Sequence, residues 1–348
     1  MTNTAESKPK FFDMSKFRET KLTNAKIKKW ASKSGIMILR YILIISLAFM
    51  ILYPLLRMIS TSITHPRAVG MVGSLWIPTE ISLNNLRVAA AIMHFSYTLP
   101  FTLINVAFIT FLQIFNAAFA GYAFARLRFR GMGILFVMVL LTFIIPRQAF
   151  RLPQHILFRN FDVFGIVTAI RGEPFNLLNQ THAIFILAGL GMGISGGLFI
   201  FIFRQFFRGL PKELEETAYV DRAGFFRTFF SIVLRMAKPA FLTVGTLSFI
   251  WNYNDLHFPS LFNPINRYLQ MRIHILSQDP GGGITRMQQW ISASRGRMGF
   301  DVVVINTPMH DGAVLVVCSL LAIVPLILLF LIIQKQFVEG VERSGIVG

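Results

Sequence analysis

Charged residues gather in one short stretch of this sequence, the segment ELEETAYVDRAG at residues 213–224. It holds four acids and an arginine, in a chain of 348 residues whose mean hydropathy is +0.59. Clustered carboxylates can perform acid–base catalysis or bind a metal, but either chemistry needs further partners. No histidine, Ser/Cys nucleophile or second pair of ligands accompanies these acids. The pattern therefore favours a solvated face or a surface that docks another protein, and it predicts neither catalysis nor a metal site.

Two short helices are expected around this segment. Pro211 suits the first turn of a helix, and the glutamates that follow it suit the positive end of the helix dipole. The helical pattern breaks near residues 222–224, as expected of a turn around a glycine. A second helix should follow, with an apolar stripe that grips the rest of the protein. That stripe consists of Phe226, Phe229, Phe230 and Val233.

The surrounding sequence is too apolar for one soluble core. It is 54% hydrophobic and only 14% charged, against about 25% charged residues in a typical soluble chain. About 20 helical residues cross a bilayer, and apolar blocks of roughly that length recur along the chain. The composition predicts an all-α integral membrane protein with about six transmembrane helices. The blocks lie at residues 36–59, 100–122, 131–146, 183–203, 239–251 and 312–333.

The distribution of basic residues predicts an orientation. Residues 1–40 contain ten Lys/Arg and three acids, and such an arm could bind nucleic acid. The positive-inside rule already accounts for it, so no nucleic-acid partner is expected. With alternating loops, the inside segments hold 22 Lys/Arg and the outside segments hold 12. Both termini, and the charged segment between the fourth and fifth blocks, are therefore predicted to be cytoplasmic.

This orientation divides the chain into parts. Residues 1–35 form a basic cytoplasmic segment, residues 36–337 a transmembrane domain, and residues 338–348 a cytoplasmic tail. Within the domain, the charged cytoplasmic loop covers about 209–238. The longest outward loop covers about 256–311 and includes a glycine-rich turn at residues 281–283 beside Trp290.

The fourth block contains glycines at a four-residue spacing, Gly189, Gly193 and Gly197. Small residues on one face of a membrane helix let two helix backbones approach closely. We interpret this stripe as a packing surface.

Polar residues within the apolar blocks are candidates for a substrate path. Such side chains usually face an interior or a cavity, although many bond a neighbouring helix instead. Amides, carboxylates and aromatic rings suit a hydroxyl-rich substrate. The candidates are Asn105, Gln113, Asn116, Trp251, Asn252, Tyr253, Asn254 and Asp255.

Several stretches resemble one known family. ELEETAYVDRAG, followed by SIVLRMAKPAF, is similar to the EAA loop of ABC-transporter permeases, which reads Glu-Ala-Ala, three residues, Gly, nine residues, Ile-x-Leu-Pro. Glu216, Thr217 and Ala218 fill the first three positions, and Ile232 and Leu234 fill the closing Ile and Leu. The likeness to the sugar-importing, maltose-type branch covers most of the chain from residue 96 onward. It is carried by AGYAFARLRFRG, FRQFFRGLPKELEE, WNYND and QKQFVEGVERSGIVG.

Two positions depart from the family's pattern. The loop glycine is replaced by Arg222, and the closing proline is replaced by Arg235. We expect Gly224, two residues later, to serve the turn instead. The outward insertions around residues 161–176 and 279–308 are also longer than usual for the family.

The resemblance implies a permease subunit of an ATP-driven sugar importer in the cytoplasmic membrane of a bacterium. It implies partners: a second, similar permease, two ATP-binding subunits, an external solute-binding protein and membrane lipid. This chain has no G-x-x-x-x-G-K-[ST] sequence, so ATP and Mg²⁺ would bind the partner subunits. No cofactor or metal is expected on this chain, and no enzymatic activity. Its coupling residues would be Glu215, Glu216, Thr217, Ala218, Asp221, Arg222 and Gly224, and its tail would be a second contact with the ATPases.

Other functions stay open on the sequence. An ion-coupled secondary transporter would need buried ionisable groups in the membrane, and Asp255 is one candidate. A membrane sensor or structural protein would keep the spans without transport. If the chain is an importer, twelve Lys/Arg against seven Asp/Glu in the outward segments would favour an anionic saccharide.

Overall fold

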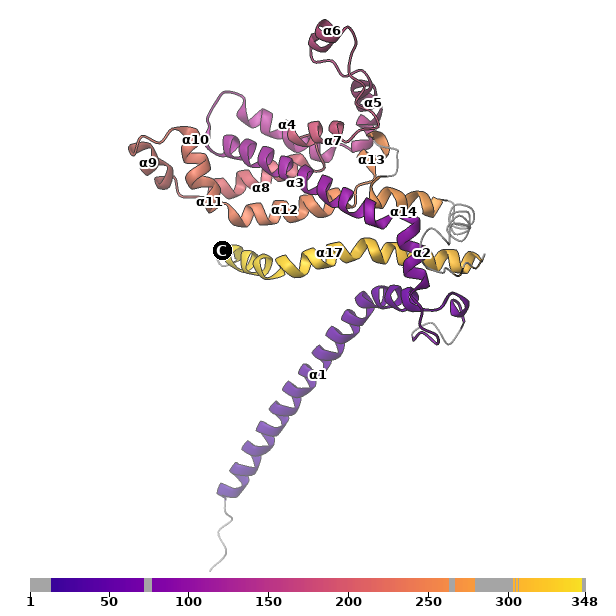
Figure 1. Ribbon diagram of the computed structural model, residues 1–348. Coiled ribbons are helices and arrows are strands. Elements are labelled where there is room, and N and C mark those ends of the chain that lie inside the picture. The colour runs from indigo at the N-terminus through magenta and orange to yellow at the C-terminus, as the bar shows by residue number, and fades with distance from the viewer. Residues whose placement is uncertain are drawn as a thin grey trace, which may run out of the picture. The chain divides into compact units, whose positions relative to one another are not determined.

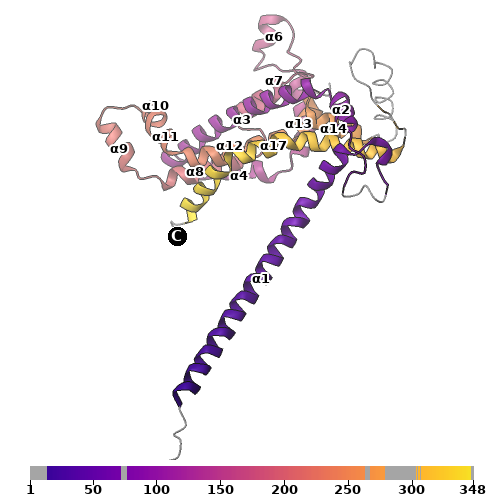
Figure 2. The ribbon, with the colours of Figure 1, turned by 60° about the horizontal axis from the view of Figure 1, so that its bottom comes forward.

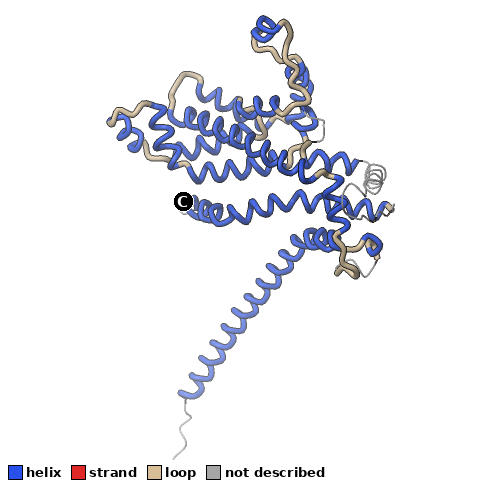
Figure 3. The backbone as a smooth tube through the Cα atoms, in the orientation of Figure 1, coloured by secondary structure: helices blue, strands red, loops and turns tan. Residues whose placement is uncertain are grey.

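The computed structural model describes residues 14–71, 77–262, 267–278, 303, 305 and 307–345, with side chains between residues 35 and 335. The described part is helical, with turns and loops between the helices (Figure 3). Two isolated bridges, Thr64–Ile81 and Phe161–Phe175, are its only β pairings. The all-α class predicted from the sequence is confirmed.

The chain divides into two units, residues 1–58 and residues 59–348. The first consists of most of α1 (Met14–Ile63). The second begins with the last turn of α1 and holds the remaining elements. The first of these are η1 (Pro66–Ala68), α2 (Asn84–Ile92), α3 (Phe95–Arg126), α4 (Met132–Ile144), η3 (Arg147–Phe150), α5 (Arg151–Arg159), α6 (Ile166–Arg171), α7 (His182–Gly189) and α8 (Gly196–Gly209). The others are α9 (Glu213–Val220), α10 (Phe225–Thr228), η4 (Phe229–Val233), α11 (Leu234–Met236), α12 (Lys238–Tyr253), α13 (His257–Phe262), α14 (Leu269–Gln278) and α17 (Pro308–Gly345).

Helix α3 is the centre of the second unit. It packs against α7, α8 and α12, while α17 packs against α2, α12 and α14. Figures 1 and 2 show α3, α8, α12 and α17 running along one another. In both views α9 lies at one end of this bundle, near the C-terminal end of α17, whereas α13 and α14 lie at the other end. The predicted coupling segment and the start of the longest predicted outward loop are thus at opposite ends.

Three helical stretches in the described part are long and apolar enough to cross a membrane: Gly35–Ile63, Phe95–Arg126 and Pro308–Lys335. Two bent pairs raise this number to five if each is one crossing. In one pair α4 and the helix after it meet at 97°, and in the other α12 meets the helix before it at 78°. The expected number of about six spans is therefore not confirmed.

The fourth apolar block explains part of the difference, because it does not form one helix. Helix α7 ends at Gly189 and α8 begins at Gly196. Between them Gly191 and Ser195 have left-handed backbone conformations, with φ of 78° and 53°. Such angles break an α-helix. The prediction of a continuous span with three glycines on one face was wrong, because Gly193 lies in the break.

Close helix packing at a glycine was nevertheless expected correctly for Gly197. A Cβ atom there would collide with the backbone oxygen of Val139 on α4 and lie 3.0 Å from Thr142 Oγ1. Gly121 plays the same part on α3, where a Cβ would lie 2.9 Å from the backbone nitrogen of Arg204 on α8. Two contacts between long helices thus depend on the absence of a side chain.

Candidate functional site

The charged segment folds as the predicted short helix, α9 (Glu213–Val220), with three glutamates in its first turn. Its C-terminal end is closed by two backbone hydrogen bonds. Ala223 N–H donates to the carbonyl of Ala218 at 2.9 Å, and Arg222 N–H donates to that of Tyr219 at 3.0 Å. This is the pattern of a Schellman motif, which requires a left-handed residue just beyond the helix.

That left-handed residue is Arg222, with φ of 58°. It stands where the resembled family has a glycine, so the backbone conformation is kept although the side chain is changed. Gly224 has φ of −72° and ψ of 166°, an extended conformation open to any residue. The expectation that Gly224 serves the turn was therefore wrong, because the register of the Schellman hydrogen bonds places the turn at residue 222.

Glu215 points inward from α9 and fixes the helix to α3. Its Oε1 lies 2.6 Å from Arg126 Nε, and its Oε2 accepts a hydrogen bond from Tyr122 Oη at 3.1 Å. Arg126 also donates to the carbonyl of Leu210, just before α9, at 3.0 Å. The Glu215 and Arg126 side chains are each only 10% exposed. Glu215 is thus an internal anchor, and Ala218 beside it is also buried.

The opposite face of α9 is exposed. It carries Glu216 and Thr217, and the exposed residues Asp221, Arg222 and Gly224 continue it beyond the helix. Thr217 donates its hydroxyl to its own helix, at the carbonyl of Glu213. Glu216 and Asp221 make no ion pair with any other residue in the described part of the chain. The fold therefore separates the predicted coupling residues into an anchoring pair and an exposed acidic edge.

The second predicted helix is divided into α10, the π-helical turn η4 and α11. Phe229 and Val233 of the predicted stripe are buried, whereas Phe226 and Phe230 are exposed. The Phe229 ring packs against that of Tyr122, with centroids 4.9 Å apart. The exposed Phe226 and Phe230 also stack on rings of α3, with centroids 6.4 Å from Phe119 and 6.5 Å from Phe115. The stripe thus packs on α3 although only half of its residues are buried. Arg235, at the position of the family's closing proline, is exposed near the bend before α12.

Three residues from the predicted substrate path meet other helices instead of a cavity. Gln113 on α3 accepts hydrogen bonds from Ser248 Oγ at 2.6 Å and Asn252 Nδ2 at 2.8 Å, both on α12. Its own amide donates to the carbonyl of Ile194 at 3.3 Å. Asn116 donates to the carbonyl of Gly189 at 2.7 Å. These side chains join α3 to α12 and to the α7–α8 break, so their hydrogen bonds are used within the protein.

Of the other path candidates, Tyr253 and Asn254 line one cavity, whereas Asn105 and Trp251 make separate contacts. Asn105 donates to the carbonyl of Phe101 on its own helix, and Trp251 stacks on Phe199 with ring centroids 5.6 Å apart. Tyr253 Oη donates to the carbonyl of Ala322 at 2.8 Å. Tyr253 and the exposed Asn254 line a cavity of about 350 Å³ together with Gln270, His274 and Ser319.

Asp255 lies in the turn between α12 and α13, and its carboxylate caps the N-terminus of α13. Its oxygens accept from the backbone N–H groups of His257 at 3.2 Å and Phe258 at 3.0 Å. Arg147 Nη1 lies 3.4 Å from Oδ1. Burial raises the pKa of Asp255, and the capping N–H groups and Arg147 offset part of this effect. These contacts give Asp255 a structural role.

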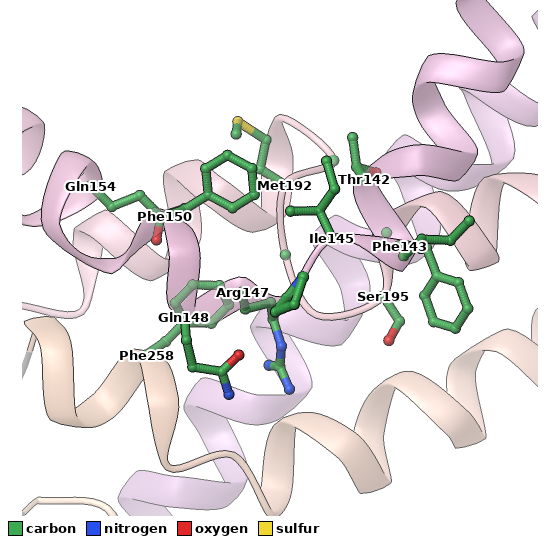
Figure 4. A pocket seen from close by; sticks show the side chains of 15 residues that line it. Thr142, Phe143, Ile145, Arg147, Gln148, Phe150, Gln154, Met192, Ser195 and Phe258 are labelled. Carbon is green, nitrogen blue, oxygen red and sulfur yellow. The ribbon is translucent and has the colours of Figure 1, made fainter.

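A second cavity, of about 340 Å³, lies between the end of α4, the α7–α8 break and Phe258. Figure 4 shows its side chains, among which Arg147 and Gln148 extend in the same direction. Arg147, Gln148, Ser195 and Gln154 bring polar atoms to its lining. The Oε1 atom of Gln154 is buried and accepts no hydrogen bond from any described residue. The sequence reasoning missed this group, although Arg147 and Gln148 directly follow the proline that ends the third apolar block and mark the start of the outward segment.

The described residues contain no group of three or more His, Cys, Asp or Glu side chains that could bind a metal ion. The segment at 281–283 with Trp290, and the side chains of the tail from residue 336, lie outside the described residues. The predictions for those two regions stay predictions.

Comparison with known proteins identifies relatives of one kind. No protein-family model matches the chain. The melibiose/raffinose/stachyose import permease protein MelC of Bacillus subtilis is 27% identical over 287 residues, 82% of this chain and 88% of MelC. The alpha-glucoside transport system permease protein AglG of Rhizobium meliloti is 33% identical over 147 residues, 42% of this chain. That match spans 36% of AglG, well under two thirds of its length.

The fold has a solved counterpart. The crystal structure of a bacterial ABC transporter involved in the import of the acidic polysaccharide alginate contains a chain that matches with a TM-score of 0.60. The match covers 88% of this chain and 98% of that chain at 19% sequence identity. These sequences and this fold confirm the resemblance drawn from the motifs: the chain is a homologue of the permease subunits of carbohydrate ABC transporters.

Proposed function

We propose that this chain is the membrane-spanning permease subunit of an ATP-driven importer that takes a sugar or oligosaccharide into a bacterial cell. The observation that supports this most is the construction of α9. One face is fixed to α3 through Glu215, and the other presents Glu216 to the exterior of the fold. A helix held in this way can transmit a push from a separate ATPase to the bundle without changing its own shape.

The push would travel along α3. Arg126 and Tyr122 receive it at one end, and Gln113, about three helical turns away, is hydrogen-bonded to Ser248 and Asn252 on α12. Movement of α9 would therefore shift α3 and α12 together. The bends of 97° and 78° lie beside these helices and could take up the change.

The partners follow from the same account. The exposed edge of α9 would enter a groove on one of two ATPase subunits, which bind ATP and Mg²⁺. The end of α17 lies at the same end of the bundle (Figure 1), so the tail would make a second contact there. A second permease would complete the pathway, and a solute-binding protein would deliver the sugar from outside. Both termini would lie in the cytoplasm.

The substrate would pass the cavity beside Arg147 more readily than the buried Gln113 group. Arg147 and Gln148 offer hydrogen-bond donors, and Gln154 offers a free acceptor. MelC is named for melibiose, raffinose and stachyose, and the matching solved transporter for the acidic polysaccharide alginate. Arg147 also pairs with Asp255, but the remaining N–H groups of its guanidinium and the basic outward segments favour a saccharide that carries carboxylates.

The test is uptake into proteoliposomes that contain this chain, the candidate permease and ATPase partners, and the binding protein. The proposal predicts uptake that needs ATP and is blocked by vanadate, with uronate oligosaccharides preferred to neutral ones. Uptake driven by a proton or sodium gradient without ATP would make the chain a secondary transporter instead. Absence of transport with every partner present would favour a sensor or structural protein. ATP-driven uptake of neutral sugars alone would overturn only the anionic substrate.

A further inference from the structure

A basic cavity of about 310 Å³ lies beside the coupling segment, at the end of the bundle that carries α9. This volume is at the lower end of the roughly 300–1,000 Å³ range of small-molecule sites. It lies where the end of α3, the start of α4, the last turns of α8 and the residue before α9 converge. The lining residues are Phe124, Ala125, Arg126, Leu127, Arg128, Met132, Arg204, Arg208 and Lys212.

Five of these nine residues are cations, and no lining residue is acidic. Arg126 is paired with Glu215. Arg128, Arg208 and Lys212 are exposed, and within the described part of the chain they form no ion pair. Like charges this close repel one another unless an anion lies between them. The positive-inside rule explains basic residues in this loop, but it does not explain why two helices and two connections direct them to one cavity.

Two of the arginines are held in fixed orientations. Arg204 donates from Nε to the carbonyl of Phe124 at 3.3 Å, and its Cζ lies 3.9 Å from the centroid of the Phe136 ring. Arg126 is fixed by Glu215 and by the carbonyl of Leu210. Rigid guanidinium groups suit phosphate oxygens better than flexible ones, because less side-chain entropy is lost on binding.

The start of α4 adds to the positive potential. This helix of 13 residues begins at Met132, which lines the cavity, and its N-cap Gly131 provides no side-chain hydrogen bond. The N–H of Met132 donates to the carbonyl of Phe129 at 3.3 Å, so it is the positive end of the helix dipole that favours an anion here. Exposed apolar side chains continue from the same place, namely Leu127, Phe129, Ile134 and Leu135.

We propose that this cavity binds the phosphate of an anionic membrane phospholipid, with the acyl chains lying along the exposed apolar residues of α4. Basic pockets between membrane helices on the cytoplasmic side are suited to such headgroups. The apolar surface beside the cavity favours a lipid over free phosphate, because inorganic phosphate has no apolar group that could contact this surface. Lipid bound here would contact the residues that precede α9, and so would brace the anchor formed by Arg126 and Glu215.

The experiment measures retained lipid on the full-length protein, purified with its partner subunits, by native mass spectrometry after exchange into phosphatidylglycerol or phosphatidylcholine. The test variant is Arg208→Gln/Lys212→Gln, because both side chains are exposed and their loss should leave the fold intact. The control is Arg227→Gln/Arg235→Gln, which removes the same charge from exposed residues of the same cytoplasmic loop outside the cavity. Titration with inorganic phosphate forms a third arm.

We expect phosphatidylglycerol to be retained at least about tenfold more than phosphatidylcholine by the native protein and the control, and this preference to disappear in the test variant. Equal retention of both lipids by the native protein would overturn the proposal, as would an equal loss in test and control variants. Displacement of phosphatidylglycerol by low millimolar inorganic phosphate would show a phosphate site and overturn the lipid assignment. The readout needs no transport, so its failure is distinguishable from failure of the proposed importer function.

Discussion

The carboxylate of Glu215 on α9 lies 2.6 Å from the guanidinium of Arg126 at the end of α3, with both side chains 10% exposed. The two residues are 89 positions apart in the sequence. Glu215 therefore belongs to the inside of the fold, although it stands in a cluster of acids that would be read as surface residues. The contact fixes α9, in the charged loop, to the end of α3.

Loss of this pair should release α9. Replacing Glu215 by Ala leaves Arg126 largely buried without its carboxylate, which typically costs about 3 kcal/mol or more. We expect a lower midpoint of thermal unfolding and faster proteolysis between residues 209 and 224. Glu213→Ala, on the exposed side of the same helix, is the matched control and should change neither. Similar proteolysis rates for the two variants would show that Glu215 does not hold the helix.

The left-handed residue after α9 gives a second prediction. A non-glycine residue with positive φ costs about 1–2 kcal/mol relative to glycine, part of which is offset by the greater entropy of glycine in the unfolded chain. Arg222→Gly should therefore raise the unfolding midpoint slightly, and Arg222→Val should lower it, because a β-branched residue tolerates this conformation poorly. Thermal unfolding in detergent compares the two. The opposite order would mean that residue 222 is not left-handed.

The glycines of the fourth apolar block differ in what surrounds them. Gly197→Ala should destabilise the protein by about 1–3 kcal/mol, because its new Cβ would press on the backbone of α4. Gly189→Ala is the control, since nothing lies within 4 Å of a Cβ there. Unfolding midpoints should separate the two variants clearly. Equal effects would contradict the close approach of α4 and α8.

Asp255 should impose a pH dependence on stability. Burial raises its pKa above the ordinary value of 3.8, so its contribution is fully present below that value and is lost as the pH rises through the raised pKa. Asp255→Asn removes this titration and keeps one oxygen to cap α13. The unfolding midpoint of the native protein should therefore fall relative to that of the variant as the pH rises above the ordinary value of 3.8. Parallel pH profiles would mean that the carboxyl titrates normally in the folded state.

Sequence patterns predicted the local features of the coupling segment well, and its long-range contacts poorly. The helix at residues 213–220 follows from its proline and glutamates, which act within one turn. Tyr122 and Arg126, which are far from Glu215 in the sequence, decide which glutamate faces inward. The residues around Glu215 do not indicate that these partners exist. The turn was misplaced by two residues, because glycine is only the commonest left-handed residue and the hydrogen bonds of the helix end decide where it lies.

The apolar blocks show the same limit at a larger scale. Hydropathy located the segments that became α1, α3 and α17, since length and composition suffice for a long helix. It did not show that Gly191 and Ser195 break the fourth block, or that the α4 and α12 segments bend sharply. Six of the eight path candidates hydrogen-bond other helices or their own, and Asp255 caps α13, because the alternatives of cavity and interhelical contact look alike in a sequence.

The most direct test of the account is ATP-driven uptake by the assembled transporter carrying Glu216→Lys. Glu216 is exposed on the face of α9 opposite the Glu215 anchor, so reversal of its charge should disturb docking but not folding. We predict that uptake and substrate-stimulated ATP hydrolysis fall at least about tenfold while membrane insertion and the unfolding midpoint are unchanged. Glu173→Lys, an equal charge change on an exposed residue of the α6–α7 connection, should transport normally. Normal uptake by the Glu216→Lys protein would contradict the claim that α9 couples this permease to its ATPase.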